Sequence, residues 1–296
     1  INCLDLRHLV AGAAQGSVCR KSPAALPPPR HQRARGRLEL DYHQHEGRTV
    51  LGGLFQSPPM RALFPDPEAD EAPICALVNT AGGLAGGDRV DIALSLGAGA
   101  QASFSTPAAE KIYRSLGPAT EISVTLEASA GAVFEWIPQE TILFEGARLE
   151  RRLNADIADD ATLLMAEALV FGRAARGETW RRGALQDSWR IQRGGKLLWA
   201  DGLSLGEDIA GDFADPFGLA NAEALGSLVL AGPLATPDLR DALREDGALA
   251  SLVRPGLLVT RWLGGAIAVR EGLGAAICRL RPALGLPARL PRLWTT

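Results

Sequence analysis

The sequence predicts a mainly β protein in which the strands are largely antiparallel and about two α-helices lie in the last third of the chain. Between residues 37 and 205, short segments that alternate apolar and polar side chains recur at close intervals, each bounded by turn residues. No helical periodicity separates these segments, and strands that follow one another without helices indicate antiparallel pairing. Helical spacing of apolar residues begins only after residue 236.

The composition is that of an ordinary globular protein. The 296 residues are 47% hydrophobic and 22% charged, which is enough for a sizeable core. The formal net charge of −3 gives no electrostatic reason to expect nucleic acid or an anionic membrane as a partner. No apolar run approaches the roughly 18 residues of a membrane span, and no secretory signal is recognisable. We therefore expect a cytoplasmic protein.

The four cysteines, Cys3, Cys19, Cys75 and Cys278, lie far apart and form no Cys-x-x-Cys pair. This spacing argues against a zinc ribbon and, in a chain of this length, against a disulfide framework. Cys75 stays a weak candidate for contact with a metal.

The chain opens with a segment that we expect to be a poorly ordered leader, residues 1–36, followed by a single domain over residues 37–296. The leader ends in a proline stretch and a basic, polar run, neither of which can bury a core.

The first predicted strand begins the domain, because Leu38, Leu40 and Tyr42 alternate with polar residues. His43 and His45 continue on its polar side. Two histidines make only a weak site for a divalent metal, so a solvated strand face is the favoured interpretation.

Residues 79–89 form a glycine-rich loop that contains Gly82, Gly83, Gly86 and Gly87. Glycine is favoured where the backbone takes positive φ or passes close to another segment, so the loop is tight and specified. A P-loop needs a Lys-Ser/Thr pair after its last glycine, and a dinucleotide fingerprint needs a following helix; the sequence supplies neither. Apolar runs on both sides predict a strand, a structural glycine loop and a second strand.

The strands that follow alternate in polarity or are apolar throughout. Residues 161–171 are almost entirely apolar, which predicts burial on both faces. Gly194 and Gly195 predict a hairpin turn. The predicted strands cover residues 100–105, 122–127, 132–137, 161–171, 179–185, 188–192 and 196–200.

Two helices are predicted near the end of the chain. Thr236 is an N-cap followed by proline and aspartate, and Gly247 closes a helix of about ten residues. Apolar residues recur at helical spacing from Ala266 to Leu280, and Pro282 stops the pattern. Residues 256–262 predict a further strand between the helices.

Five motifs occur in order along the chain: GGLAGGDR (82–89), TPAAEKIYRS (106–115), FEWIPQETILFEGA (134–147), FGRAARGE (171–178) and PARLPRLW (287–294). In this series the chain resembles the urease accessory protein UreD family, called UreH in some organisms. The resemblance runs from about residue 37 to the C-terminus and leaves residues 1–30 outside it.

The resemblance implies a β-helix-like stack of strands with two helices, and a role without catalysis. Members of the family act as scaffolds or chaperones in the maturation of urease, a nickel enzyme. The implied partners are the urease structural subunits, UreF and, through UreF, the GTPase UreG. No tightly bound cofactor is implied, and nickel would pass through the UreD–UreF assembly in transit.

Carboxylates inside the matched motifs, and Glu167 in the apolar run 161–171, are the candidates for an ion path, because oxygen ligands hold nickel less firmly than a thiolate–imidazole cage does. Asp88 ends the glycine loop, where small neighbours are expected to leave it approachable, and Glu140 sits near a turn after an apolar strand. Glu167 needs a cationic partner if it is buried, and Arg173 could supply it. Glu178 closes the fourth motif. For each carboxylate, a structural salt bridge or turn cap is the favoured alternative.

Four further residues of these motifs are candidates for a partner surface. Arg89 follows Asp88 in the loop, and Lys111, Tyr113 and Arg114 form a polar-aromatic cluster. Tyr113 could instead pack inward.

Two other functions stay open on the residues alone. One is a β-rich hydrolase that uses Asp88 and Glu140 as a general acid and base, although the sequence does not place the two side chains together. The other is a nickel-storage protein.

Overall fold

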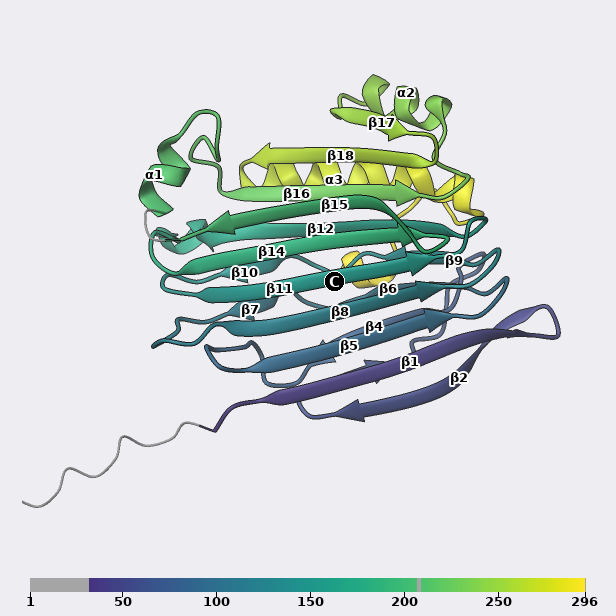
Figure 1. Cartoon of the computed structure of the whole chain (residues 1–296), viewed down its shortest axis with the longest axis horizontal. Helices are drawn as coiled ribbons and strands as arrows, with labels where there is room; N and C mark the ends of the chain where they lie inside the picture. Colours follow the sequence, from purple (N-terminus) through teal and green to yellow (C-terminus); the bar gives the residue numbers. More distant parts are fainter. Residues whose placement is uncertain (1–31, 207–208, 296) are drawn as a thin grey trace, which may run out of the picture. The chain divides into compact units, whose positions relative to one another are not determined.

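The structure, a computed structural model, describes residues 32–206 and 209–295. This part of the chain is mainly β and forms two sheets, one of seven strands (sheet A) and one of eleven (sheet B). Sheet A, from top to bottom in Figure 1, consists of β15 (Lys196–Leu205), β14 (Ala184–Arg193), β11 (Arg148–Ile157), β8 (Thr120–Ala128), β5 (Arg89–Leu96), β1 (Arg35–His45) and β2 (Arg48–Ser57).

Sheet B runs behind it. Its main path is β17 (Ala250–Arg254), β18 (Leu257–Gly264), β16 (Ala224–Ala231), β12 (Thr162–Arg173), β9 (Val133–Trp136), β6 (Gln101–Ser105), β4 (Ile74–Asn79) and β3 (Met60–Leu63). Three short strands attach to this path: β7 (Glu110–Ile112), β10 (Thr141–Leu143) and β13 (Glu178–Thr179).

The central strands are stacked as in a solenoid, which confirms the predicted mainly β, stacked architecture. From β4 to β14 the chain passes back and forth between the sheets. Each coil adds one strand to sheet A and one to the main path of sheet B, and the later coils also add one of the short strands β7, β10 and β13. Strands of successive coils therefore run in the same direction, and β1, β5, β8, β11 and β14 pair in parallel. The prediction of largely antiparallel strands is wrong for this part of the body.

Antiparallel pairs lie towards the ends of the stack. The hairpin of β14 and β15 turns at Gly194 and Gly195 as predicted, and β1 pairs with β2. Sheet B continues beyond β12 through antiparallel β16, β18 and β17. Of the predicted leader, residues 1–36, residues 1–31 lie outside the part of the chain that the structure describes.

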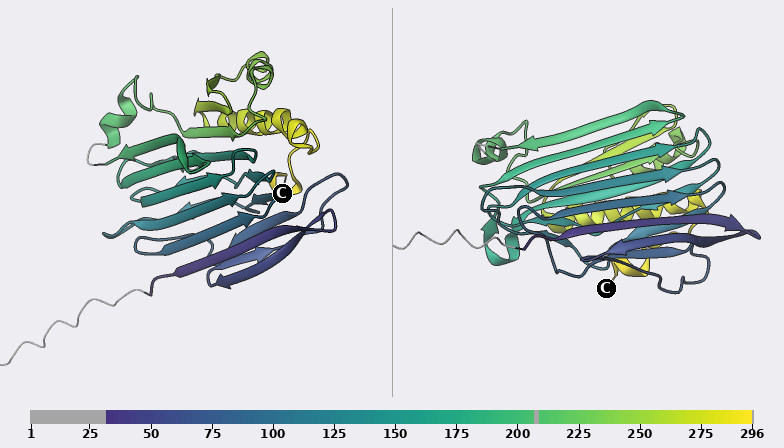
Figure 2. Two further views of the ribbon diagram at one scale, coloured as in Figure 1. Left: turned by 45° about the vertical axis from the view of Figure 1, so that its right-hand side comes forward. Right: turned by 60° about the horizontal axis from the view of Figure 1, so that its bottom comes forward.

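Both predicted helices are present. α2 (Pro237–Glu245) begins at the N-cap Thr236, whose hydroxyl accepts a hydrogen bond from the backbone of Leu239. α3 (Ala266–Leu280) lies along the face of sheet B that points away from sheet A (Figures 1 and 2). The six-residue α1 (Ile209–Ala214) was not predicted. None of the helices in the described part is long and apolar enough to cross a bilayer.

Two hydrophobic cores follow from this arrangement. The first lies between the sheets and includes Phe104, Phe134 and Leu153. The second lies between sheet B and α3, where Leu164 meets the apolar side of the helix around Leu273. Strand β12 contributes alternate side chains to both cores, which is why its sequence is apolar almost throughout.

The glycine-rich loop joins β4 to β5 as predicted. Gly82, Gly83 and Gly87 take positive φ, with values of 72°, 147° and 89°. Gly86 does not. A Cβ atom at Gly86 would lie 2.0 Å from Ser115 Oγ, so this position is glycine because another turn of the solenoid passes against it.

Candidate functional site

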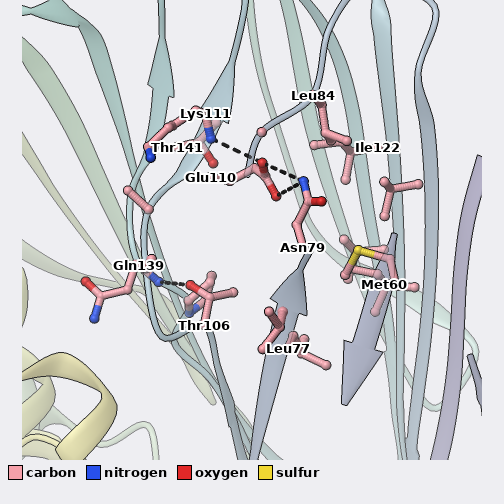
Figure 3. A pocket seen from close by; sticks show the side chains of 18 of the residues that line it. Met60, Leu77, Asn79, Leu84, Thr106, Glu110, Lys111, Ile122, Gln139 and Thr141 are labelled. Carbon is pink, nitrogen blue, oxygen red and sulfur yellow. Dashed lines mark hydrogen bonds between the residues drawn. The ribbon is translucent and has the colours of Figure 1, made fainter. Parts of the chain in front are cut away.

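A cavity of about 160 Å³ lies between the two sheets beside the glycine loop (Figure 3). Most of its wall is apolar and comes from both sheets, with Met60, Leu77, Val90, Ile92, Ile122, Val124 and Trp136 among the lining residues. Polar side chains also line the cavity: Asn79, Thr106, Glu110, Lys111, Gln139, Thr141, Arg151 and Glu167. We call it the first cavity.

Glu110 is a titratable side chain in the wall of this cavity. It lies on β7, where the Asn79 amide donates to both carboxylate oxygens at 3.0 and 3.1 Å (Figure 3). Burial raises the pKa of Glu110 to about 7, against the opposing effect of these hydrogen bonds. The side chain can therefore exchange a proton at neutral pH.

A buried ion network borders the first cavity. The guanidinium of Arg151 (β11) lies 2.8 Å from Glu167 Oε2 (β12) and donates to both oxygens of Asp187 (β14) at 2.9 and 2.7 Å. The indole of Trp136 donates to Glu167 Oε1 at 2.7 Å. Burial raises the pKa of Glu167, and the charge of Arg151 opposes this rise. One cation thus holds two buried carboxylates and joins sheet A to sheet B.

A second cavity, of about 70 Å³, lies against the same network. Arg151 and Glu167 line both cavities, and the second also receives Asp187, Asp201 and Arg261. Asp201 and Arg261 form an ion pair there. Carboxylates therefore occur along both spaces, with the ion network between them. In residues 32–206 and 209–295, no three His, Cys, Asp or Glu side chains gather closely enough to hold a metal ion.

The glycine-loop candidates have structural partners. Asp88 is only 8% exposed, and its two oxygens accept hydrogen bonds from the backbone of Ala34 and Ala85 at 2.8 and 2.7 Å. The expectation that Asp88 is approachable is therefore wrong: its carboxylate caps the loop. Arg89 is exposed and pairs with Asp91 and Glu121.

Two other predicted carboxylates form ion pairs outside the cavities. Glu140 accepts a hydrogen bond from Arg270 of α3 at 2.6 Å. Glu178 pairs with Arg173, which lowers the pKa of its carboxyl group. Arg173 is thus the partner of Glu178 and not, as expected, of Glu167. Asp88 and Glu140 share no partner in the described part of the chain, so the geometry does not assemble the proposed acid–base pair.

Lys111, Tyr113 and Arg114 are exposed, as a partner surface requires. The hydroxyl of Tyr113 donates to the carbonyl of Gly82 at 2.9 Å, and its ring packs edge-on against Phe144. Tyr113 therefore supports the glycine loop from outside rather than packing into the core.

The weak metal candidates do not come together. His43 and His45 are exposed at the end of β1. Cys75 is fully buried beside Tyr42, and burial raises the pKa of its thiol to about 12, which keeps it protonated.

Glu110, Arg151, Asp187 and Asp201 were missed from the sequence. For Arg151 and Asp187 the sequence contains a pattern that could have identified them. In β11 the buried side chains alternate, and Arg151 stands between Leu149 and Leu153 on the buried face. In β14 Asp187 likewise occupies a buried position. A charged residue at the apolar phase of an alternating strand is therefore the pattern that marks this network.

Comparison with known proteins gives consistent matches. A family model described as UreD urease accessory protein matches residues 34–295. A urease accessory protein UreD of Granulibacter bethesdensis is 52% identical over 238 residues, which is 78% of this chain and 99% of the relative. Proteins of the same description from Magnetococcus marinus and a Methylobacterium species are 42% and 44% identical, over 89% and 90% of this chain and 94% and 97% of theirs.

Proposed function

This chain belongs to the UreD family of urease accessory proteins, and we propose that it is a scaffold in urease maturation with no catalytic activity of its own. In this proposal it acts in the cytoplasm, where it binds the urease structural subunits and UreF and recruits the GTPase UreG through UreF. Nickel is the cargo of the assembly and is not held as a tightly bound cofactor.

The observation that supports a path for nickel is the pair of inter-sheet cavities with carboxylates along them. Glu110, Glu167, Asp187 and Asp201 offer oxygen ligands at separate points rather than in one cage. Carboxylates alone bind a borderline cation such as Ni²⁺ loosely enough to release it. A pKa of about 7 at Glu110 also means that the carboxyl group is partly protonated at neutral pH when no cation is near.

Glu110→Gln tests this path, because it removes one negative charge without changing the size of the side chain. Glu127→Gln is the matched control, since Glu127 is exposed on the outer face of β8. Each variant is co-expressed with the urease gene cluster, and the nickel content of purified urease is measured together with the amount of UreF that co-purifies. We expect Glu110→Gln to lower the nickel content, Glu127→Gln to leave it unchanged, and both to retain UreF.

A second variant blocks the space itself. Ala109 lines the first cavity, and Ala109→Trp places a large ring there. If urease acquires its full nickel content with both Glu110→Gln and Ala109→Trp, the first cavity is not the path. If a strain that lacks the whole chain still loads urease normally, the scaffold proposal itself fails.

A further inference from the structure

Three arginines gather around one hollow, where successive coils of the solenoid turn into sheet A. The strands β8, β11 and β14 begin at the left-hand end of the stack in Figure 1. Arg114, Arg148 and Arg182 are evenly spaced along the sequence. Arg114 and Arg182 lie in the turns that lead into β8 and β14, and Arg148 is the first residue of β11. We call these three residues the arginine face. They border a hollow of about 400 Å³ whose other lining residues are Ser115, Leu116, Gly117, Glu145, Gly146 and Gly183.

Backbone hydrogen bonds between coils fix these turns. The amide of Ser115 donates to the carbonyl of Gly146 at 2.9 Å, and the amide of Gly146 donates to the carbonyl of Arg182 at 2.9 Å. Gly183 has a φ of 139°, and a Cβ there would lie 1.9 Å from the carbonyl oxygen of Ala147. These hydrogen bonds and close contacts hold the backbone of the turns around the hollow in a fixed position.

The charge of the arginine face is only partly neutralised. Arg182 pairs with Glu145 at 2.8 Å, and Glu145 also accepts a hydrogen bond from the backbone of Arg181 at 2.6 Å. Arg114 and Arg148 are exposed, and within residues 32–206 and 209–295 no carboxylate pairs with either. Two guanidinium groups are therefore available to an incoming anion.

The neighbouring turn adds to this positive charge. Arg176 and Arg181 are exposed there, while Glu178 is engaged by Arg173. Around the hollow, these arginines outnumber the two carboxylates Glu145 and Glu178, whereas the whole chain has a formal net charge of −3. Such asymmetry orients an encounter with an acidic partner and repels a basic one.

We propose that the arginine face binds an acidic segment of a partner protein. Its carboxylates would pair with Arg114 and Arg148, whose planar guanidinium groups suit bidentate binding of carboxylate. Leu116, which is 78% exposed at the edge of the hollow, offers a contact for an apolar side chain of the same segment. A protein segment fits this combination better than a nucleic acid, which the negative charge of the remaining surface disfavours.

A direct binding assay tests the surface without reference to urease. The probe is a short fluorescein-labelled peptide rich in glutamate and leucine, and the reference peptide has glutamine at each glutamate. The test variant is Arg114→Glu/Arg148→Glu. The control is Arg190→Glu, which reverses an exposed arginine on β14 that has no ion pair in the described part of the chain.

We expect the double variant to bind the acidic peptide about tenfold or more weakly, because like charges then face each other. Arg190→Glu should stay within about twofold of the parent. Parental binding should weaken as NaCl is raised, and the glutamine peptide should bind poorly. An equal effect of Arg190→Glu, salt-independent binding, or displacement of the peptide by duplex DNA at equal concentration would each overturn the proposal.

The choice of natural partner rests on the proposed function. Purified UreF, UreG and urease apoprotein are each immobilised, and the parent and both variants are bound at low and raised salt. We expect one of the three partners to bind Arg190→Glu as it binds the parent, and to bind the double variant much more weakly. If a strain without the chain fails to activate urease but the double variant binds all three partners normally, the arginine face has no such role while the scaffold function stands. If the strain without the chain activates urease normally, the proposed scaffold function is wrong. The peptide assay alone then shows whether the arginine face binds acidic segments.

Discussion

Replacing Arg151 by methionine is the most direct test of the buried ion network. Arg151 is 4% exposed, and its two partners, Glu167 and Asp187, are 4% and 8% exposed. Methionine keeps most of the aliphatic volume of the arginine and removes only the guanidinium. The variant therefore leaves two carboxylates between the sheets with no cation beside them.

The expected loss in the free energy of unfolding follows from the number of charges left unpaired. Removing one member of a buried ion pair destabilises a protein by about 3–5 kcal/mol. Because Arg151 serves two carboxylates at 2.8 and 2.7 Å, we expect a loss of about 4–5 kcal/mol in the free energy of unfolding. This is a large part of the roughly 5–15 kcal/mol by which a domain is stable.

The loss should depend on pH in a defined direction. In the parent, burial already raises the pKa of Glu167 and the charge of Arg151 opposes this rise. Without the guanidinium that opposition is lost, so the folded-state pKa of Glu167 rises further above the unfolded one. The folded variant then binds more protons than the unfolded chain, and its stability falls as the pH rises. The difference between parent and Arg151→Met should therefore be smaller at pH 5 than at pH 8.

Urea unfolding followed by tryptophan fluorescence measures both quantities. Arg190→Met is the control, because Arg190 is exposed on the outer face of β14, and a change within about 0.5 kcal/mol is expected. The triple variant Arg151→Met/Glu167→Gln/Asp187→Asn removes all three charges and should recover most of the loss. A loss of less than about 1 kcal/mol for Arg151→Met, or one that is the same at both pH values, would refute the description of a charged, buried network.

Three further changes test other parts of the structure. Gly86→Val should prevent accumulation of folded protein, because its Cβ would collide with Ser115 Oγ at 2.0 Å; limited proteolysis would detect this, and a normal pattern would contradict it. Cys75 should resist iodoacetamide at pH 8 until urea unfolds the chain, because burial raises its thiol pKa to about 12; peptide mapping reports the labelling, and rapid reaction of the native protein would contradict its burial. Glu110→Gln should stabilise the protein by about 3 kcal/mol at pH 8 and by little near pH 4, because a folded-state pKa raised to about 7 costs stability as the pH rises to 7; equal unfolding midpoints at pH 8 would contradict the raised pKa.

The sequence located most strands correctly because alternation is a local property. Ile122, Val124 and Leu126 turn inward on β8 as their spacing predicts. The direction of pairing has no local signature: it follows from the passage of the chain to the other sheet between successive strands of one sheet. Residues 179–185, predicted as one strand, divide into β13 and β14, and the positive φ of Gly183 lies between them.

The helices were predictable for a related reason. The N-cap of α2 at Thr236 and the stop of α3 before Pro282 depend on residues adjacent in the sequence. α1 has only six residues, too few for helical periodicity to appear.

The sequence predicted that the candidate site contains carboxylates with cationic partners, but not which arginine pairs with which carboxylate. The sequence analysis expected a buried Glu167 to have a cationic partner. Arg151 is that partner, and it lies on the opposite sheet. Arg173 lies closer in sequence and pairs with Glu178 instead. Which strands face each other across the core is set by the stacking of coils, and a single sequence does not encode that in any local pattern.

Stability alone does not account for three charged side chains beside two cavities. Neutral groups of similar size often replace a buried ion pair without loss of stability, so a network kept only for stability could be lost freely. Two roles are compatible with its position: it fixes the register of β11, β12 and β14, or its carboxylates also exchange a cation in transit. The neutral triple variant separates them. If it restores stability and urease also receives its full nickel content, the network serves the fold alone. If stability returns while the nickel content stays low, Glu167 and Asp187 take part in the transfer, because amide oxygens replace ionised carboxylates poorly as ligands for a divalent cation.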